Sequence, residues 1–345
     1  SVAATLLKIF FVRIENGKPD MPRILVTPAV FKDGHGPWRD VLDAAGFEVV
    51  IPPVNCMQIS SEEFLTHLQG IDGALAGIEQ YNPEVFAGSA LKVVARVGVG
   101  FDQVNLEAAT EHGVAVTITP GTNEHSVAEQ AIALITAVFR DTARRDREIR
   151  AGQWRRTSPR RLAGNTIGLL GLGRIGRAMI PRCQGLGLDV IGYDPFAKPE
   201  MAAELGIRLA TFDEVISQSD IVSLHMPCTA ETTDLMNAET FAKMKPDSVL
   251  INTSRGGLVD EVALVAALTD GPLWGAGLDV CKVEPLPADS PLREHGNIVF
   301  SPHLGGIDAT ALDAMGQLAA ECVVDVLSGR WPEPCVVNPE VKSAD

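Results

Sequence analysis

The chain of 345 residues is long enough for two domains, and its 46% hydrophobic and 21% charged residues are typical of a folded globular protein. No apolar run reaches the roughly 18–20 residues that span a bilayer, so neither disorder nor a membrane partner is expected for the bulk of the chain. A formal net charge of −15 repels phosphate backbones, which disfavours nucleic acid as a partner.

Six cysteines are scattered along the chain without a CxxC pair, and none stands near a histidine at the spacing of metal ligands. This usage predicts reduced thiols, a cytoplasmic location and no metal site. Residues 1–20 precede the first strand-like segment and lack the basic start and cleavage site of a signal peptide. They are expected to be an upstream extension that lies outside the fold.

In the first part of the chain, short apolar segments alternate with helical patterns. Strands are predicted over residues 23–27, 47–51, 73–76, 91–96 and 114–118. Helices are predicted between them over residues 38–45, 61–69 and 105–112. This alternation favours a parallel sheet with helices on both faces.

A long helical pattern follows over residues 126–150. It begins apolar and ends in four arginines, which suit the negative end of a helix dipole: Arg144, Arg145, Arg147 and Arg150. A helix of this length could cross between two domains. Residues 152–164 contain Pro159 and begin and end with glycine, so we expect a loop, with its arginines in solvent.

The alternation then restarts with stronger strand signals. Strands are predicted over residues 166–170, 189–193, 220–225, 248–253, 276–280 and 298–301. Their continuous hydrophobicity indicates central strands that are covered on both faces. Helices are predicted over residues 258–268 and 309–327, before an extended tail over residues 332–339. The chain is therefore predicted to hold two successive α/β halves.

A glycine motif marks a candidate dinucleotide site. Gly171, Gly173 and Gly176 follow the strand predicted over residues 166–170 and precede a helix. The first allows a tight turn, the second lets the backbone approach a pyrophosphate, and the third allows close packing of helix on strand. Asp194 follows Gly176 by 18 residues, at the end of the next strand, where a carboxylate would bind ribose hydroxyls and repel a 2′-phosphate. The motif predicts NAD rather than NADP.

Three later strand ends carry groups suited to hydride transfer between a hydroxyl and a carbonyl. Such a site needs a cation, a group that exchanges a proton near neutral pH, and a partner that orients this group. Arg255, Glu284 and His303 each follow a predicted strand. Because the carboxyl ends of parallel strands meet at one edge of a sheet, these three residues are candidates for one site.

Seven blocks in this order resemble the D-isomer-specific 2-hydroxyacid dehydrogenases, especially their D-3-phosphoglycerate dehydrogenase-like branch. The strong blocks are GLLGLGRIG (168–176), SLHMPCTAETTDLMN (223–237), MKPDSVLINTSRGGLVDE (244–261), GAGLDVCKVEP (275–285) and SPHLGG (301–306). Weaker blocks are RVGVGFDQVNL (96–106) and GTNEHSVAE (121–129). Together they extend the resemblance over most of the chain from Arg23 to Asn338.

The resemblance implies roles for these residues. His303 would exchange the proton, Glu284 would stabilise the imidazolium, and Arg255 would bind the carboxylate and carbonyl of a D-2-hydroxy acid or its 2-oxo partner. Backbone at Val99 and Gly100 would also bind the substrate carboxylate. Cofactor contacts are implied, beyond the motif glycines, for Arg174, Ile175, Asp194, Met226, Thr253, Asp279, Gly305 and Gly306.

The family architecture implies a Rossmann nucleotide domain inserted into a split flavodoxin-like substrate domain, both doubly wound around parallel sheets. The nucleotide domain would span residues 122–304, and the substrate domain residues 21–121 and 305–345. A homodimer through the nucleotide domain is implied as well, with the active site in the cleft between the domains.

Departures from the family pattern narrow the range of candidate substrates. Phosphate-binding members carry an arginine after the third strand, whereas residues 76–80 hold none and include Glu79. A hydroxypyruvate- or glyoxylate-type acid is therefore favoured, with D-3-phosphoglycerate as the alternative. Pro302 stands where formate dehydrogenases use glutamine, which disfavours formate. An NAD-sensing, corepressor-like protein is the alternative without catalysis, and the presence of Arg255, Glu284 and His303 argues against it.

Overall fold

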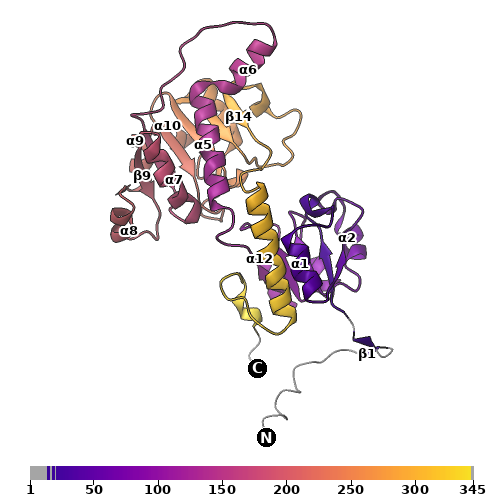
Figure 1. The fold of residues 1–345 in the computed structure, drawn as a ribbon. Helices are drawn as coiled ribbons and strands as arrows, with labels where there is room; N and C mark the ends of the chain where they lie inside the picture. The colour runs from indigo at the N-terminus through magenta and orange to yellow at the C-terminus, as the bar shows by residue number, and fades with distance from the viewer. Residues whose placement is uncertain (1–13, 16–17, 20, 343–345) are drawn as a thin grey trace. The chain divides into compact units, whose positions relative to one another are not determined.

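The computed structural model describes residues 14, 15, 18, 19 and 21–342. The chain divides into two units: unit 1 comprises the described residues up to Asn123 and those from Ala309, and unit 2 is Glu124–Asp308 (Figure 1). The extension predicted for residues 1–20 lies mostly outside the described residues. Within it, β1 (Ile14–Glu15) pairs antiparallel with β2 (Lys18–Pro19).

Unit 1 is built on a parallel sheet, with five strands among its described residues in the order β4-β3-β5-β6-β7. The strands are β3 (Arg23–Val26), β4 (Glu48–Val50), β5 (Gly73–Ala76), β6 (Val93–Arg96) and β7 (Ala115–Thr117). Counted along the chain, this is the order 2-1-3-4-5 of flavodoxin-like sheets.

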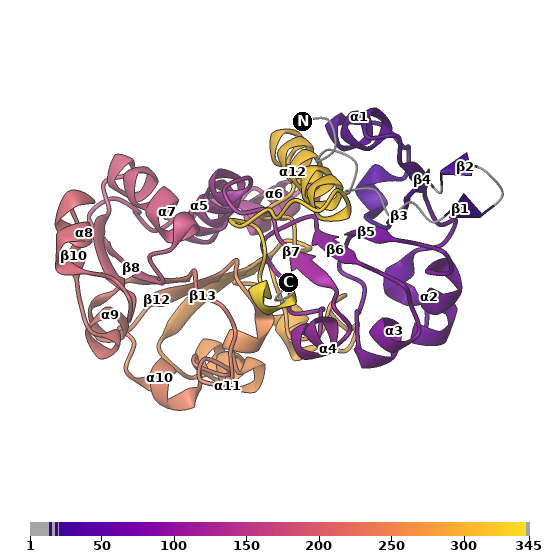
Figure 2. The same ribbon diagram turned by 90° about the horizontal axis from the view of Figure 1, so that it is seen from below.

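Helices cover both faces of this sheet (Figure 2). They are α1 (Pro37–Ala44), α2 (Ser61–His67), α3 (Pro83–Ala87), α4 (Leu106–Glu111) and α12 (Ala309–Leu327). One core cluster joins α1 and α12 to the strands through Trp38 and Val323, and another joins α2, α3 and α4 to them through Phe64, Phe86 and Ala109. Every residue of β5 and β6 is buried, which fits the apolar sequence of β5 and of residues 93–95 in β6.

Unit 2 is built on a second parallel sheet, of seven strands within the described residues, in the order β10-β9-β8-β11-β12-β13-β14. The strands are β8 (Thr166–Leu170), β9 (Asp189–Tyr193), β10 (Arg208–Leu209), β11 (Ile221–Leu224), β12 (Ser248–Asn252), β13 (Leu273–Leu278) and β14 (Ile298–Phe300). Along the chain this reads 3-2-1-4-5-6-7, the Rossmann order with one added strand. The prediction of two parallel-sheet α/β domains is confirmed.

The helices of unit 2 also lie on both faces of its sheet. They are α5 (Glu124–Arg140), α6 (Thr142–Arg150), α7 (Arg174–Gly185), α8 (Pro199–Glu204), α9 (Phe212–Gln218), α10 (Ala238–Ala242) and α11 (Glu261–Thr269). Figure 2 shows α5 and α7 on one side of β12 and β13, and α10 and α11 on the other. The described residues also form short 3₁₀ helices over Ala29–Phe31, Cys56–Gln58, Gly256–Leu258, Pro291–Glu294 and Pro339–Val341.

The prediction of a single helix over residues 126–150 is wrong. The structure has two helices there, α5 and α6, which are separated at Asp141. Asp141 adopts a left-handed conformation with φ of 56°, and its carboxylate accepts a hydrogen bond of 2.7 Å from Arg144 Nε. Val138 and Phe139 are the last buried residues of α5, and no residue of α6 is buried. The helix breaks where its apolar face ends, since α6 has no core to follow.

The strand predicted over residues 276–280 begins earlier, as β13, and ends before Asp279. The strand includes Gly275 and Gly277. Glycine is needed there because α5 packs directly on β13: a Cβ at Gly277 would lie 2.8 Å from the Leu134 Cβ. The early end leaves Asp279 in the loop rather than in the sheet. In the described part of the chain, no helix has the length and apolar character needed to cross a membrane.

Candidate active site

The glycine motif forms the turn between β8 and α7. Gly171 has φ of 102°, and a Cβ there would lie 2.4 Å from the His225 carbonyl oxygen. A Cβ at Gly176 would lie 2.1 Å from the Gly171 oxygen, whereas a Cβ at Gly173 would meet no atom within 4 Å. Helix α7 begins at Arg174 without a side-chain cap, so its first N–H groups remain available to an anion. The turn is therefore tightly packed at Gly171 and Gly176 and open at Gly173.

Asp194 lies at the carboxyl end of β9 and is tied to the glycine turn. Its Oδ2 accepts a hydrogen bond of 2.8 Å from the Leu172 N–H, and its Oδ1 accepts one of 2.8 Å from the Phe196 N–H. A carboxylate oxygen can accept more than one hydrogen bond, so both oxygens can still accept from hydroxyl groups of a ligand.

The strand ends of β11 and β12 hold two buried polar atoms that have no hydrogen-bond partner in the described part of the chain: the Thr253 Oγ1 and the His225 Nδ1. Thr253 is only 8% exposed. His225 is held by Ser223, whose Oγ lies 2.9 Å from the His225 Nε2, and burial lowers the pKa of this imidazole to about 4. His225 is therefore neutral at working pH, whereas the Thr253 hydroxyl fits a ligand group. Met226, the next residue, is half-buried against the core.

Arg255 follows β12, and the side chain of Asn252 holds the backbone around it. The Asn252 side-chain amide donates to the Arg255 carbonyl oxygen over 2.8 Å, and its oxygen accepts from the Ser254 N–H over 3.0 Å. The next residue must be glycine, because a Cβ at Gly256 would lie 2.0 Å from the Cys281 carbonyl carbon. The loop after β12 thus packs directly on the loop after β13.

Glu284 and His303 form a hydrogen-bonded pair across the loops after β13 and β14. The His303 Nδ1 lies 2.7 Å from the Glu284 Oε2, and the two side chains are 39% and 32% exposed. Because an ionised carboxylate only accepts, Nδ1 carries the proton and Nε2 is left for proton exchange. The other Glu284 oxygen accepts from the Cys281 N–H over 2.9 Å.

Several groups decide the charge of Glu284. Partial burial opposes its ionisation, but the hydrogen bonds from His303 and the Cys281 N–H, together with the positive charges of His303 and Arg255, outweigh burial and lower the pKa of Glu284. The carboxylate is therefore ionised at neutral pH. The positive charge of Arg255 thus helps to keep Glu284 ionised.

Asp279 lies beneath the His303 loop and is 3% exposed. Its Oδ1 accepts from the Leu304 N–H over 2.9 Å, its Oδ2 accepts from the Gly305 N–H over 2.8 Å, and its carbonyl oxygen accepts from the His303 N–H over 2.8 Å. A Cβ at Gly305 would lie 2.8 Å from the Asp279 Oδ2, so glycine is needed for this approach. Sequence reasoning missed the residue that bonds to Asp279 from the other side, Ser301, whose only signal is its place two residues before His303.

The two residues expected to bind the substrate carboxylate, Val99 and Gly100, lie in the loop after β6 in unit 1. Arg96, 4% exposed, holds this loop: its Nε donates to the Gly100 oxygen over 3.0 Å and its Nη1 donates to the Ala76 oxygen over 3.1 Å. After the neighbouring β5, Glu79 is 2% exposed and accepts hydrogen bonds from its own unit. Both charged side chains thus shape backbone within unit 1.

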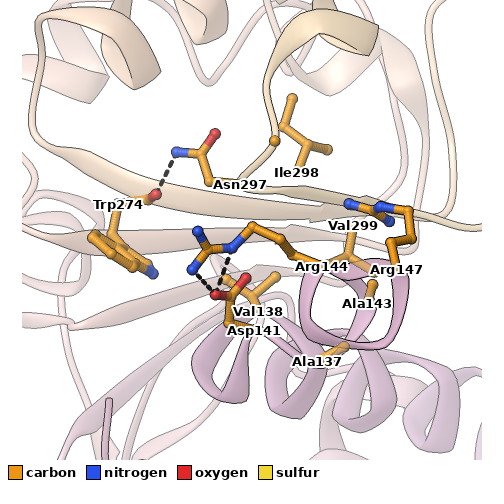
Figure 3. Close-up of a pocket in the computed structure, with 11 residues that line it drawn as sticks. Ala137, Val138, Asp141, Ala143, Arg144, Arg147, Trp274, Asn297, Ile298 and Val299 are labelled. Carbon is orange, nitrogen blue, oxygen red and sulfur yellow. Dashed lines mark hydrogen bonds and ion pairs between the residues drawn. The ribbon is translucent and has the colours of Figure 1, made fainter. Parts of the chain in front are cut away.

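A pocket of about 320 Å³ lies elsewhere in unit 2, beside the break between α5 and α6 (Figure 3). Its lining includes Val138, Arg144 and Arg147 from the helices, together with Trp274 and Ile298. Because Trp274 and Ile298 stand at the amino-terminal ends of β13 and β14, this pocket is at the opposite end of the strands from Glu284 and His303.

Comparison with known proteins identifies the family. The model of the D-isomer specific 2-hydroxyacid dehydrogenase, NAD binding domain, matches residues 132–305. The D-3-phosphoglycerate dehydrogenase of Mycobacterium leprae is 45% identical over 254 residues, which are 73% of this chain and 48% of that protein. The chain thus spans about half the length of this relative.

Two further proteins are similar over nearly their whole length. The glyoxylate reductase of Thermofilum pendens is 37% identical, over 93% of this chain and 95% of that protein. The crystal structure of the TT0316 protein from Thermus thermophilus is 37% identical with a TM-score of 0.81, over 91% of this chain and 99% of that one. Since the family model also covers half of the residues, the chain belongs to the D-isomer-specific 2-hydroxyacid dehydrogenase family.

Proposed function

We propose that this protein is an NAD-dependent D-2-hydroxyacid dehydrogenase that interconverts a small 2-oxo acid and its D-2-hydroxy acid. One observation carries the proposal: the pair of Glu284 and His303, joined over 2.7 Å, stands at strand ends of the same sheet that bears the glycine turn and Arg255. The groups that we assign to proton exchange, anion binding and dinucleotide binding thus follow the carboxyl ends of strands in one sheet.

The residues around the glycine turn fit NAD. The open side of Gly173 and the uncapped start of α7 at Arg174 and Ile175 suit a pyrophosphate, and Asp194 suits the adenosine ribose. The Thr253 hydroxyl offers a buried hydrogen bond that no described residue takes. We also assign contacts with the cofactor to Met226, Asp279, Gly305 and Gly306. When bound, NAD supplies or accepts the hydride.

Each member of the catalytic set has one task in this proposal. Arg255 binds the substrate carboxylate and polarises the carbonyl, because a guanidinium has several N–H donors and can bond to an oxygen of each group. His303 gives a proton from Nε2 to the carbonyl oxygen during reduction and takes it back during oxidation. Glu284, ionised at neutral pH, fixes the ring through Nδ1 and stabilises its charged form. Backbone at Val99 and Gly100 is proposed to bind the substrate carboxylate as well.

For the substrate, we favour a 2-oxo acid with a small uncharged side chain, such as glyoxylate or hydroxypyruvate. Glu79 adds a buried negative charge at the strand ends of unit 1, and Arg96 there spends two donors on backbone carbonyls. Residues 76–80 hold this acidic side chain and no arginine, which disfavours a second anionic group on the substrate. D-3-phosphoglycerate is the second candidate, because the relative with 45% identity is a D-3-phosphoglycerate dehydrogenase.

Three further assignments belong to this proposal. The nucleotide domain is assigned residues 122–304, and the substrate domain residues 21–121 and 305–345. A homodimer is assigned to the face of unit 2 formed by α5 and α6, where Ile149 of α6 is exposed and where exposed Trp274 lines the pocket of Figure 3. A cytoplasmic location is assigned because all six cysteines are unpaired in the described structure.

A panel of 2-oxo acids, followed by the loss of NADH absorbance, tests the proposed activity. The panel is glyoxylate, hydroxypyruvate, phosphohydroxypyruvate and pyruvate. We expect turnover with at least one acid, and a higher kcat/KM for glyoxylate or hydroxypyruvate than for phosphohydroxypyruvate. Preference for phosphohydroxypyruvate would support the second candidate, and binding of NADH without turnover of any acid would contradict the dehydrogenase proposal.

A further inference from the structure

The loop that carries His303 is held in a conformation that a histidine rarely adopts. His303 has φ of 55°, in the left-handed region, where residues with a Cβ need support from their surroundings. The support comes from Asp279, which accepts hydrogen bonds from three successive backbone N–H groups, those of His303, Leu304 and Gly305. The position of the His303 ring therefore depends on how the Asp279 carboxylate is held.

Ser301 holds that carboxylate from the other side. Its hydroxyl donates a short hydrogen bond to the Asp279 Oδ1, and its own oxygen accepts a hydrogen bond of 2.8 Å from the Gln130 Nε2. Gln130 lies on α5, which packs on β13 and β14 through buried side chains such as Leu134. A continuous path of hydrogen bonds thus runs from a helix of the core, through Ser301 and Asp279, to the loop of His303.

We propose that Gln130 and Ser301 are positioning residues for His303, and that they act on it through Asp279. This inference rests on the proposed function, in which His303 exchanges the proton. The two partners restrain His303 from different directions: Glu284 fixes its ring, and the path from Gln130 fixes its backbone. Without the Ser301 hydroxyl, the Asp279 carboxylate loses a donor, and the loop can shift the His303 ring out of line with Glu284 and the substrate.

Two disruptive substitutions, one at Ser301 and one at Gln130, test the path, each with a matched control in the same unit, and a third, conservative substitution tests rescue. Ser301→Ala removes the hydroxyl and Ser301→Thr keeps it, while Gln130→Met removes the donor at similar length. The controls are Ser217→Ala and Gln184→Met, because each removes one hydrogen bond to a backbone oxygen away from the His303 loop. For reduction, kcat, the dissociation constant of NADH and the pH profile are measured for every variant.

We expect kcat to fall roughly 10- to 100-fold in Ser301→Ala and roughly 3- to 10-fold in Gln130→Met, since small displacements of a catalytic group cost this much. The upper pH limit of reduction should move lower in both, because a displaced ring loses part of its contact with Glu284. Ser301→Thr should restore kcat to within about threefold of the unchanged protein. The two controls should match the unchanged protein in all three measurements.

A double variant tests whether the two residues act along one path. If Gln130 acts through Ser301, adding Gln130→Met to Ser301→Ala should lower kcat no further. Multiplication of the two separate losses would contradict the path. Unchanged kcat and pH profile in Ser301→Ala, or equal losses in Ser217→Ala, would overturn the positioning role.

A readout that needs no turnover separates this inference from the proposed function. The Nδ1 proton of a histidine bonded to a carboxylate gives a low-field proton NMR signal, which His303→Ala identifies by its loss. This signal should weaken or shift in Ser301→Ala and stay unchanged in Ser217→Ala. If the unchanged protein turns over no 2-oxo acid, the proposed function fails and the NMR signal still decides the positioning. A signal unaffected by Ser301→Ala would overturn the inference.

Discussion

In unit 1, two charged side chains at strand ends are buried: Glu79, after β5, is 2% exposed and Arg96, the last residue of β6, is 4% exposed, and both bond to groups of their own loops. In unit 2, the side chains of Glu284 and His303 are 32% and 39% exposed, and Thr253 keeps a hydroxyl without a partner among the described residues. Both units share the same layers and parallel strands. Architecture alone therefore does not single out a candidate site; unsatisfied or half-exposed groups at strand ends do.

The largest effect is expected at His303. His303→Ala should slow reduction by roughly 10²–10⁴-fold, the usual range for loss of a positioned general acid. The dissociation constant of NADH should stay within about twofold, because we assign that binding to the glycine turn and Asp194. Steady-state kinetics and a fluorescence titration of NADH measure the two effects. A fully active variant would remove His303 from the mechanism.

Asp194 should determine the choice of cofactor. Asp194→Ala loses hydrogen bonds to the ribose and repulsion of a 2′-phosphate, each worth about 1–3 kcal/mol. The preference for NAD over NADP should fall by roughly 10- to 100-fold. Because the Asp194 carboxylate also holds the Leu172 N–H, Asp194→Asn is the control that keeps an acceptor at that position. An unchanged NAD to NADP ratio in Asp194→Ala would contradict the cofactor placement.

Glu284 should set the pH range of the reaction. Glu284→Gln removes the anion beside the imidazolium, so the charged ring becomes less stable. In the proposed mechanism reduction needs protonated His303, so its upper pH limit should move to lower pH. Oxidation needs the neutral ring, so its lower limit should move in the same direction. Profiles of kcat against pH for both directions measure this, and unchanged limits would remove the pairing.

The same carboxylate also links stability to pH. Its pKa in the folded protein is lowered from the ordinary value of 4.5, so its contribution to folding is complete above that value. The contribution is lost as the pH falls through the lowered pKa. Acid unfolding of Glu284→Gln should therefore lack this part of the pH dependence.

Thr253 should show a smaller effect with opposite signs for binding and stability. Thr253→Val replaces a buried hydroxyl that lacks a partner by a methyl group of similar volume, which should leave the protein as stable or more stable by about 1 kcal/mol. Binding of NADH should weaken roughly three- to tenfold, because the ligand loses a buried hydrogen bond. Thermal unfolding and an NADH titration test both signs, and unweakened binding would show that the hydroxyl does not face the cofactor.

The smallest effect is expected in unit 1. Glu79→Gln keeps an oxygen that can accept from the Gly77 N–H, so stability should change by less than about 1 kcal/mol. Affinity for NADH should not change. The kcat/KM ratio of phosphohydroxypyruvate to hydroxypyruvate should rise about threefold, since a buried negative charge is lost. An unchanged ratio would separate Glu79 from substrate choice.

The sequence predicted the alternation of strands and helices because continuous apolar runs and glycine turns are local signals. It did not predict the break at Asp141, which arises where the core beneath α5 ends. The bounds of helix α9 were also not predicted, although Thr211 and Glu214 form a capping box that marks its start.

In the candidate site too, local features could be predicted from the sequence, whereas contacts between distant residues could not. The glycine turn, Asp194 and the strand-end residues could be read from spacing, because each lies next to a strand. The contact between Gln130 and Ser301 joins residues 171 positions apart and leaves no pattern in the sequence. The left-handed conformation of His303 likewise depends on Asp279, which the sequence placed inside a strand.

Oxidation of separated glycerate isomers tests the central claim most directly, because it joins the cofactor, the stereochemistry and His303 in one assay. NAD reduction is followed with D-glycerate and with L-glycerate, for the unchanged protein and for His303→Ala. The account predicts NADH formation with D-glycerate, little or none with L-glycerate, and a loss of at least about 100-fold with D-glycerate in His303→Ala. Turnover of the L isomer alone, or full activity of His303→Ala with D-glycerate, would contradict it.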